Sequence, residues 1–393
     1  MNRFSLFLCL FEIAIYLSND MYLPALPQIM HELNISSSLV QFTLISWLLG
    51  TTSTQLLLGP ISDRYGRKPL VLIAAVTFII SSIVCAFSYN ITILLLGRFI
   101  QGCTVCAISV AGYAAIHELY DTRQAIQIIS LMASITVLAP AFGPLLGSLV
   151  LLQGSWRLIF LILAVWGLIS FYSLLFSMPE THQPEKRTCF NLSTLLKNYA
   201  GILKNKVFME HTLIHSLISI GIVAWITISP LLVIDSFKYS PLAYGLIQAG
   251  IFLGFMAGAR LVQKNIMVIN TAKLIRYGLI IVSGSSLTSL VLAVLWPHFL
   301  LGFILSMGAY ATGGSIMFGT LNRLAIDASD KPMGVRLSIF SSIISLAVVG
   351  GGTLASLSYD GTILSIACVL STVSVLACFV KLYGPTNNFY KKI

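Results

Sequence analysis

Long apolar runs, separated by shorter polar stretches, recur along the whole 393-residue chain. A run of about 18 or more apolar residues is long enough to cross the ~30 Å hydrocarbon core of a membrane as an α-helix. The pattern predicts twelve such helices, over residues 4–26, 39–60, 70–88, 92–116, 126–151, 156–177, 207–233, 242–262, 271–293, 298–321, 335–358 and 361–382. The chain is therefore predicted to be an all-α protein that crosses a membrane many times.

One polar stretch is much longer than the others and divides the predicted helices into six and six. It covers residues 178–206 and contains two prolines and five basic residues. We expect an N-terminal six-helix bundle over 1–177, a cytoplasmic linker over 178–206, and a C-terminal six-helix bundle with a short cytoplasmic tail over 207–393. Two halves of this kind are typical of alternating-access carriers, whose substrate site lies near the bilayer midplane.

The charged residues are few and unevenly placed. They make up 9% of the chain, whereas an ordinary soluble domain carries about 25%. All 23 lysines and arginines except Arg98, Arg157 and Lys238 fall on one side of the predicted topology. By the positive-inside rule that side is cytoplasmic, so both termini are predicted to be cytoplasmic. The net charge of +10 thus reflects topology and does not indicate a nucleic-acid partner.

Two acidic residues, Glu12 and Asp20, lie inside the first apolar run. An ionisable side chain at membrane depth costs about 2.5–3.5 kcal/mol, and by default it marks an ion or substrate pathway. One acid alone could lie near a helix end and reach the interface, but two on one helix favour a functional interpretation. With Tyr16 they are spaced by four residues and share a broad helix face. We expect this run to be a retained helix and not a cleaved signal peptide.

An arginine, Arg98, lies inside the fourth predicted span. Asp20 and Arg98 are each six residues from the outer end of their predicted helices. At a rise of ~1.5 Å per residue, both lie about 9 Å from the outer boundary, whereas Glu12 lies ~12 Å deeper than Asp20. The sequence therefore places Asp20 and Arg98 at one depth and separates Glu12 from them.

The loop after the second predicted helix, residues 59–69, reads GPISDRYGRKP. We expect Gly59 and Gly66 to permit close packing, and Asp63 to cap a helix or pair with a basic residue. Four charges in six residues could also form no more than a solvated loop that sets the orientation of the chain.

The fifth span contains APAFGPLLGS at residues 139–148. Small residues such as Gly143 and Gly147 let helix backbones approach closely, and Pro140 and Pro144 can bend the helix. The prolines fit a moving interface and static packing equally well.

Three of these patterns together resemble motifs of the major facilitator superfamily. The loop 59–69 resembles the signature between its second and third helices, and LGRFIQG at residues 96–102 resembles its arginine motif. The segment 139–148 is similar to the antiporter motif, although Ser148 stands where that motif usually has a second glycine. The resemblance is to the proton-coupled drug antiporters of the superfamily. It is close to a bacterial multidrug transporter over residues 1–180, and the second half carries no motif of comparable sharpness.

The resemblance implies the fold and assigns roles to residues. It implies twelve helices in two six-helix halves, with proton coupling and recognition of cationic substrates at Glu12, Asp20 and Arg98. A nearby arginine and burial act oppositely on a carboxyl group, which can poise Asp20 to gain and lose a proton. The implied cytoplasmic gate is Gly59, Asp63, Arg64, Gly66 and Arg67, and the implied antiporter motif is Pro140, Gly143, Pro144 and Gly147. Aromatic and methionine side chains suit varied lipophilic ligands, so the candidate substrate-binding residues are Glu12, Tyr16, Asn19, Asp20, Tyr113, Met132 and Trp225.

The expected function is proton-driven export of small lipophilic, often cationic drugs from the cytoplasm. The alternative is a dedicated exporter of an endogenous metabolite such as a siderophore. A membrane enzyme is not expected, because the sequence shows no nucleophile–base or metal constellation at a membrane face. We expect a monomer in the bacterial inner membrane that needs no cofactor, no metal and no nucleic acid, and whose partners are its substrate, protons and the lipid bilayer.

Overall fold

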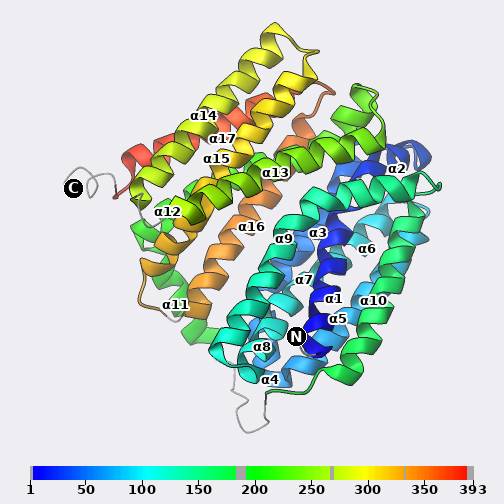
Figure 1. Cartoon of the computed structure of the whole chain (residues 1–393), viewed down its shortest axis with the longest axis vertical. Helices are drawn as coiled ribbons and strands as arrows, with labels where there is room; N and C mark the ends of the chain where they lie inside the picture. The colour runs from blue at the N-terminus through cyan, green and yellow to red at the C-terminus, as the bar shows by residue number, and fades with distance from the viewer. Residues whose placement is uncertain (1–2, 183–191, 266–269, 332, 387–393) are drawn as a thin grey trace. The chain divides into compact units, whose positions relative to one another are not determined.

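The computed structural model describes residues 3–182, 192–265, 270–331 and 333–386. Every regular element in these ranges is a helix (Figure 1). The chain divides into two compact units, Met1–Phe190 with Tyr239–Leu246, and Asn191–Lys238 with Ile247–Ile393. The fold is thus all-α, as the apolar runs predict.

The first unit contains the helices that carry most of the predicted site residues. They are α1 (Arg3–Asp20), η1 (Leu23–Ala25), α2 (Leu26–Glu32), α3 (Ser37–Gln55), α4 (Leu58–Tyr65), α5 (Arg67–Ala86), α6 (Ile91–Cys103), α7 (Val105–Ala107), η2 (Ile108–Gly112), α8 (Tyr113–Leu119), α9 (Thr122–Leu151) and α10 (Arg157–Ser177). Within this unit α1 packs against α9 and α10, and α3 packs against α6 (Figure 1).

The second unit contains α11 (Leu192–Leu203), α12 (Lys206–Pro230), η4 (Leu231–Ser236), most of α13 (Pro241–Asn265), α14 (Thr271–Leu295), α15 (Leu300–Asp327), α16 (Met333–Ser358) and α17 (Ile363–Tyr383). Here α12 packs against α15, α16 and α17. The segment predicted as a linker therefore includes a helix, α11. Its Ile202 is buried in an apolar cluster with Phe208 and Phe340, among others.

Two predicted spans are interrupted in ways that the apolar pattern does not show. The first run ends as α1 at Asp20 and continues through a 3₁₀ turn into α2, with Pro24 and Pro27 near the starts of these two elements. Proline suits the first turn of a helix because its missing N–H has no partner there. The fourth run contains a π-helical segment, η2, between α7 and α8. Such π segments occur frequently at functional sites.

Eleven helical stretches in the described ranges are long and apolar enough to span a membrane, and α3 is not among them. The second predicted span, 39–60, corresponds to α3, which is rich in Ser, Thr and Gln. Its polar side chains Gln41 and Thr43 are buried. A β-carbon on Gly50 of α3 would lie 2.1 Å from the Phe99 carbonyl oxygen of α6. Close backbone packing of this kind accounts for a helix of low hydropathy inside the unit.

Candidate functional site

Glu12 lies in the middle of α1 and is 1% exposed. Its Oε1 accepts a hydrogen bond from the Tyr113 hydroxyl at 3.0 Å, while its Oε2 has no hydrogen-bond partner. Tyr113 is the first residue of α8 and directly follows the π segment η2, which therefore helps to place its side chain. Tyr16, one turn along α1, is partly buried. The structure thus joins two predicted site residues that are 101 positions apart.

Asp20 is the last residue of α1 and is also buried. Its Oδ1 accepts a hydrogen bond from Asn19 Nδ2 at 3.1 Å. A β-carbon on Gly143 of α9 would lie 2.5 Å from the Asp20 Cβ, and one on Gly147 would lie 1.7 Å from the Met21 carbonyl oxygen. The two glycines of the predicted antiporter motif therefore form the contact between α9 and the end of α1 that carries Asp20.

Two prolines of the same motif, Pro140 and Pro144, lie inside α9. Each removes a backbone donor from the helix interior, which weakens the local hydrogen-bond ladder. The helix that contacts Asp20 is therefore interrupted in its bonding at that contact.

Arg98 of α6 is completely buried but forms no ion pair with Asp20. Among the ion pairs of the described residues, none joins these two side chains. Arg98 Nη1 donates to the Ser18 carbonyl oxygen at 2.8 Å and to Gln101 Oε1, whereas its Nε and Nη2 have no hydrogen-bond partner. The guanidinium carbon also lies 4.2 Å from the centre of the Tyr22 ring.

Arg98, which the sequence places at the depth of Asp20, thus hydrogen-bonds to the end of the helix that carries Asp20. The last carbonyl groups of an α-helix carry partial negative charge and lack intrahelical donors, so they attract a cation. Ser18 lies two residues before Asp20, so this hydrogen bond of the arginine goes to the backbone at the end of α1 that carries the aspartate.

The remaining predicted substrate residues lie in different units. Met132 of α9 is fully buried in the first unit. Trp225 of α12 is fully buried in the second unit, where its indole N–H donates to Gln248 Oε1 at 2.8 Å. Gln248 was not predicted, although a glutamine inside the apolar run 242–262 was a usable signal.

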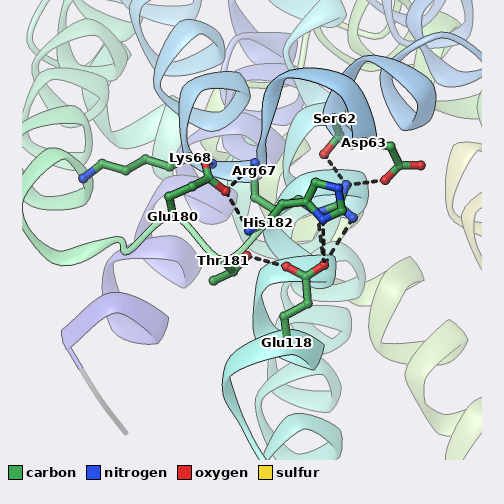
Figure 2. A network of polar contacts seen from close by, with 8 residues as sticks. All are labelled: Ser62, Asp63, Arg67, Lys68, Glu118, Glu180, Thr181 and His182. Carbon is green, nitrogen blue, oxygen red and sulfur yellow. Dashed lines mark hydrogen bonds and ion pairs between the residues drawn. The ribbon is translucent and has the colours of Figure 1, made fainter. Parts of the chain in front are cut away.

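The predicted gate loop takes part in a larger polar cluster, which we call the Arg67 network. It consists of Ser62, Asp63, Arg67, Lys68, Glu118, Glu180, Thr181 and His182 (Figure 2). Arg67 Nη1 donates to Ser62 Oγ at 2.7 Å and to Asp63 Oδ1 at 2.6 Å. Its Nε and Nη2 donate to Glu118 Oε1 at 3.3 and 3.2 Å. Asp63 therefore pairs with a basic residue and does not cap a helix.

Glu180, just beyond α10, holds the first turn of α5 in the Arg67 network. Its carboxylate accepts the backbone N–H groups of Arg67 at 3.0 Å and Lys68 at 3.3 Å (Figure 2). Gly66 has a φ of +104°, and a β-carbon there would lie 2.5 Å from Glu180 Oε2. Because L side chains rarely adopt this φ, the turn requires glycine at position 66.

The rest of the network ties Thr181 to Glu118. The Thr181 hydroxyl donates to Glu118 Oε2, and His182 Nδ1 lies 3.8 Å from Glu118 Oε1. The sequence did not predict Glu118, Glu180 or Thr181. These residues are 51 or more positions from Arg67, and no short motif links them.

Two predicted gate residues lie outside the network. A β-carbon on Gly59 would meet nothing within 4 Å, so the expectation that Gly59 permits close packing is wrong. Gly59 lies near the start of the short helix α4, and the space beside its α-carbon is open. Arg64 is exposed, and its guanidinium lies 5.3 Å from the centre of the Tyr65 ring.

Comparisons with known proteins show the family and the fold of the chain. The sequence profile of the Major Facilitator Superfamily matches residues 8–352. The chloramphenicol resistance protein CraA of Acinetobacter baumannii is 33% identical over 342 residues, covering 87% of this chain and 82% of CraA. The multidrug transporter MdfA of Yersinia pestis is 32% identical over 367 residues, covering 91% of this chain and 87% of MdfA. MdfA is also the transporter that residues 1–180 resemble, and the likeness extends well into the second half.

Solved structures share the fold at low sequence identity. The D-xylose–proton symporter superposes with a TM-score of 0.77 at 16% identity and covers 98% of both chains. A bacterial homologue of the human lysosomal transporter Spinster gives 0.75 at 13% identity, covering 96% of this chain and 95% of the homologue. At these identities the likeness concerns the fold alone.

Proposed function

The chain belongs to the major facilitator superfamily, and from this we propose that it exports small lipophilic, often cationic drugs from the cytoplasm in exchange for protons. The relatives named above are a multidrug transporter and a drug resistance protein. Fold and relatives indicate a multi-pass membrane transporter and not an enzyme. The observation that carries the finer proposal is the pair of buried carboxylates on α1, one of which keeps an oxygen without a partner.

In this proposal Asp20 is the proton-coupling residue. A proton that enters from outside neutralises Asp20, and the loss of its charge changes the contact between α1 and the proline-containing part of α9. The guanidinium group of Arg98 holds the end of α1 through the Ser18 carbonyl. Opening toward the cytoplasm then releases the proton, and drug binding favours the deprotonated form.

Glu12 is the proposed partner of a cationic drug. Tyr113 occupies one carboxylate oxygen and fixes its orientation, so Oε2 remains for a ligand. Tyr16 and Asn19 share α1 with it, while Met132 and Trp225 are buried side chains of their own units that we propose contact the drug when the site opens. A buried charge with an open acceptor is expensive, which favours retention of such a group for a ligand or an ion.

The driving force depends on the charge of the substrate. A proton that moves inward releases about 2.3 kcal/mol per 100 mV, enough for a roughly fifty-fold gradient of a neutral substrate exchanged one for one. Exchange of one proton for a monovalent cation moves no net charge and draws on the pH gradient alone.

The Arg67 network is the proposed cytoplasmic gate, with Asp63, Gly66 and Arg67 as its parts from the predicted loop. The positive-inside pattern predicts that this loop and both termini are cytoplasmic, and we propose that the protein is a monomer in the bacterial inner membrane. Every polar partner of the network comes from the first unit. The gate as seen here therefore fixes α4, α5, α8 and the chain after α10 to one another.

The test is proton release from inside-out vesicles with an acidic interior. Ethidium or chloramphenicol is added, and dequenching of a pH dye is compared between wild type, Asp20→Asn and Asp121→Asn. Asp121 caps α9 through its side chain, and asparagine caps helices equally well, so this variant is the matched control.

We expect drug-dependent proton release in wild type and Asp121→Asn, and none in Asp20→Asn. Full release in Asp20→Asn contradicts the coupling role of Asp20. A folded wild type that responds to no drug contradicts drug export and favours the export of an endogenous metabolite.

A further inference from the structure

A cavity of about 610 Å³ opens at the end of the first unit where α1 begins and α8 and α10 end. Its walls include Arg3, Phe4, Tyr120, Tyr172 and Phe176. All of these residues belong to the first unit, and none belongs to the proposed drug or coupling site. The volume lies within the range of about 300–1,000 Å³ that is typical of small-molecule sites.

The position of the cavity is at a membrane boundary. It lies where three helices with apolar spans begin or end, at the end that the positive-inside pattern assigns to the cytoplasm. Tyr172 and Phe176 are 54% and 84% exposed. Aromatic side chains at the ends of spanning helices sit at the level of the lipid headgroups. The cavity therefore faces the lipid–water interface and not the protein interior.

The charge of the cavity selects an anion. Arg3 is the single charged residue among the ten that line it. The guanidinium group matches phosphate oxygens with two parallel hydrogen bonds. Ser173 and Ser177 add hydroxyl groups to the same wall. Glu180 follows the lining residue Pro179, but both of its carboxylate oxygens accept backbone N–H groups. The positive charge of Arg3 disfavours a cationic drug here.

One face of α10 continues from the cavity toward the middle of the span. Val165, Ile169, Tyr172 and Phe176 are spaced by four, three and four residues, and each is more than half exposed. This spacing places them on one helix face. The cavity with its arginine matches a polar headgroup, and the apolar stripe that begins there matches a long apolar tail. A lipid combines these two parts.

We propose that this cavity binds an anionic phospholipid of the cytoplasmic leaflet, with its phosphate on Arg3 and an acyl chain along the exposed face of α10. Basic cavities between helices on the cytoplasmic side are suited to acidic lipid headgroups. The walls also include Leu119 and Pro179, the neighbours of Glu118 and Glu180 in the Arg67 network (Figure 2). A bound lipid therefore buttresses the two chain segments that supply the carboxylates of the network.

The experiment is native mass spectrometry of the full chain in detergent with phosphatidylglycerol or phosphatidylcholine of identical acyl chains. The variants are Arg3→Ala, Arg3→Lys and Arg123→Ala. Arg123 is an exposed arginine at the start of α9 in the same unit, and it serves as the matched control. A second readout is the rise in melting temperature that each lipid produces.

We expect wild type and Arg123→Ala to retain phosphatidylglycerol over phosphatidylcholine. Arg3→Ala is expected to lose that preference about tenfold, the equivalent of ~1.4 kcal/mol, and Arg3→Lys to keep part of it. Equal binding of the two lipids, or an undiminished preference in Arg3→Ala, overturns the proposal. Glycerophosphoglycerol, the headgroup without acyl chains, tests the source: if it raises the melting temperature as much as the lipid does, the cavity is a site for soluble phosphates and the lipid proposal is wrong.

Discussion

The α1 region and the Arg67 network contain the same kinds of polar side chain. They differ in how many of the polar atoms have a hydrogen-bond partner. In the α1 region Glu12 Oε2, Asn19 Oδ1 and two nitrogens of Arg98 are buried without a hydrogen-bond partner. In the Arg67 network both oxygens of Glu118 and of Glu180 accept hydrogen bonds, and all three guanidinium nitrogens of Arg67 donate (Figure 2). The exception there is His182 Nε2.

We propose that the difference separates groups that stabilise the structure from groups that bind a proton or a ligand. An unpaired buried polar atom costs about 1–3 kcal/mol, and more when it is charged. We propose that in the α1 region a proton, a ligand or another group occupies these positions for part of the transport cycle. The Arg67 network avoids the cost and fixes the turn between α4 and α5. We therefore expect substitutions in the α1 region to alter transport with little change in stability, and substitutions in the network to alter stability as well as gating.

Glu12→Gln is expected to have the largest effect on transport. The amide keeps the shape of the side chain but removes the charge that attracts a cation, so ethidium-driven proton release should be lost while the response to neutral chloramphenicol remains. The measurement is the same vesicle assay with both drugs. Tyr113→Phe, which removes one hydrogen bond to the carboxylate, should weaken the ethidium response by a few-fold, consistent with ~1 kcal/mol for such a bond.

Equal loss of both drug responses in Glu12→Gln would place Glu12 in the proton pathway and remove its separate role. A fall in melting temperature without any change in transport would be more serious. It would mean that the open oxygen of Glu12 is a structural defect, and the contrast between the two regions would fail.

Gly66→Ala and Gly59→Ala form a matched pair within the network loop. At position 66 the backbone has φ +104° and ψ 164°, a conformation that costs residues other than glycine about 1–3 kcal/mol, and the new β-carbon would displace the Glu180 carboxylate. At position 59 there is open space, and alanine in a helix is favoured over glycine by about 0.5–1 kcal/mol. Thermal unfolding in detergent should therefore show a clear loss for Gly66→Ala and none for Gly59→Ala. Equal melting temperatures would contradict the role of Glu180 as the cap of α5.

The sequence predicted these two regions unequally, and the reason is sequence separation. Apolar runs set the helices, and residues close in sequence, such as Asp63 and Arg67, can be paired from their spacing of four. The contacts of Arg67 with Glu118 and Glu180 span 51 and 113 residues and depend on how α5, α8 and α10 pack. The π segment at 108–112, which places Tyr113, has no marker in the apolar pattern either.

The predicted site on α1 shows the same limit. Glu12 and Asp20 were visible because lipid makes any acid conspicuous, but their partners were not. Depth along the helix axis put Arg98 beside Asp20, whereas the structure directs the guanidinium to the Ser18 carbonyl. Depth gives one coordinate of a side chain, and the direction in which it points depends on the helix end and on Gln101 and Tyr22 nearby.

Substitution of Asp360 has the smallest expected effect. It shows what a solvent-exposed acid outside both regions contributes to stability. Asp360 is exposed between α16 and α17, where the Thr362 hydroxyl and backbone N–H donate to it and lower its pKa. Because the folded pKa is the lower one, this contribution to stability is present above an aspartate's ordinary value of about 3.9 and is lost as the pH falls through the folded pKa. Asp360→Asn should therefore lower the melting temperature slightly at pH 6 and not at all near pH 2. The fall in melting temperature on acidification should be correspondingly smaller in the variant than in wild type.

If the melting temperatures of the variant and of wild type fall equally, Asp360 contributes nothing to stability through its charge. The stability cost of removing a solvated carboxylate would then be zero, and any loss measured in the Arg67 network could be assigned to its buried bonds alone.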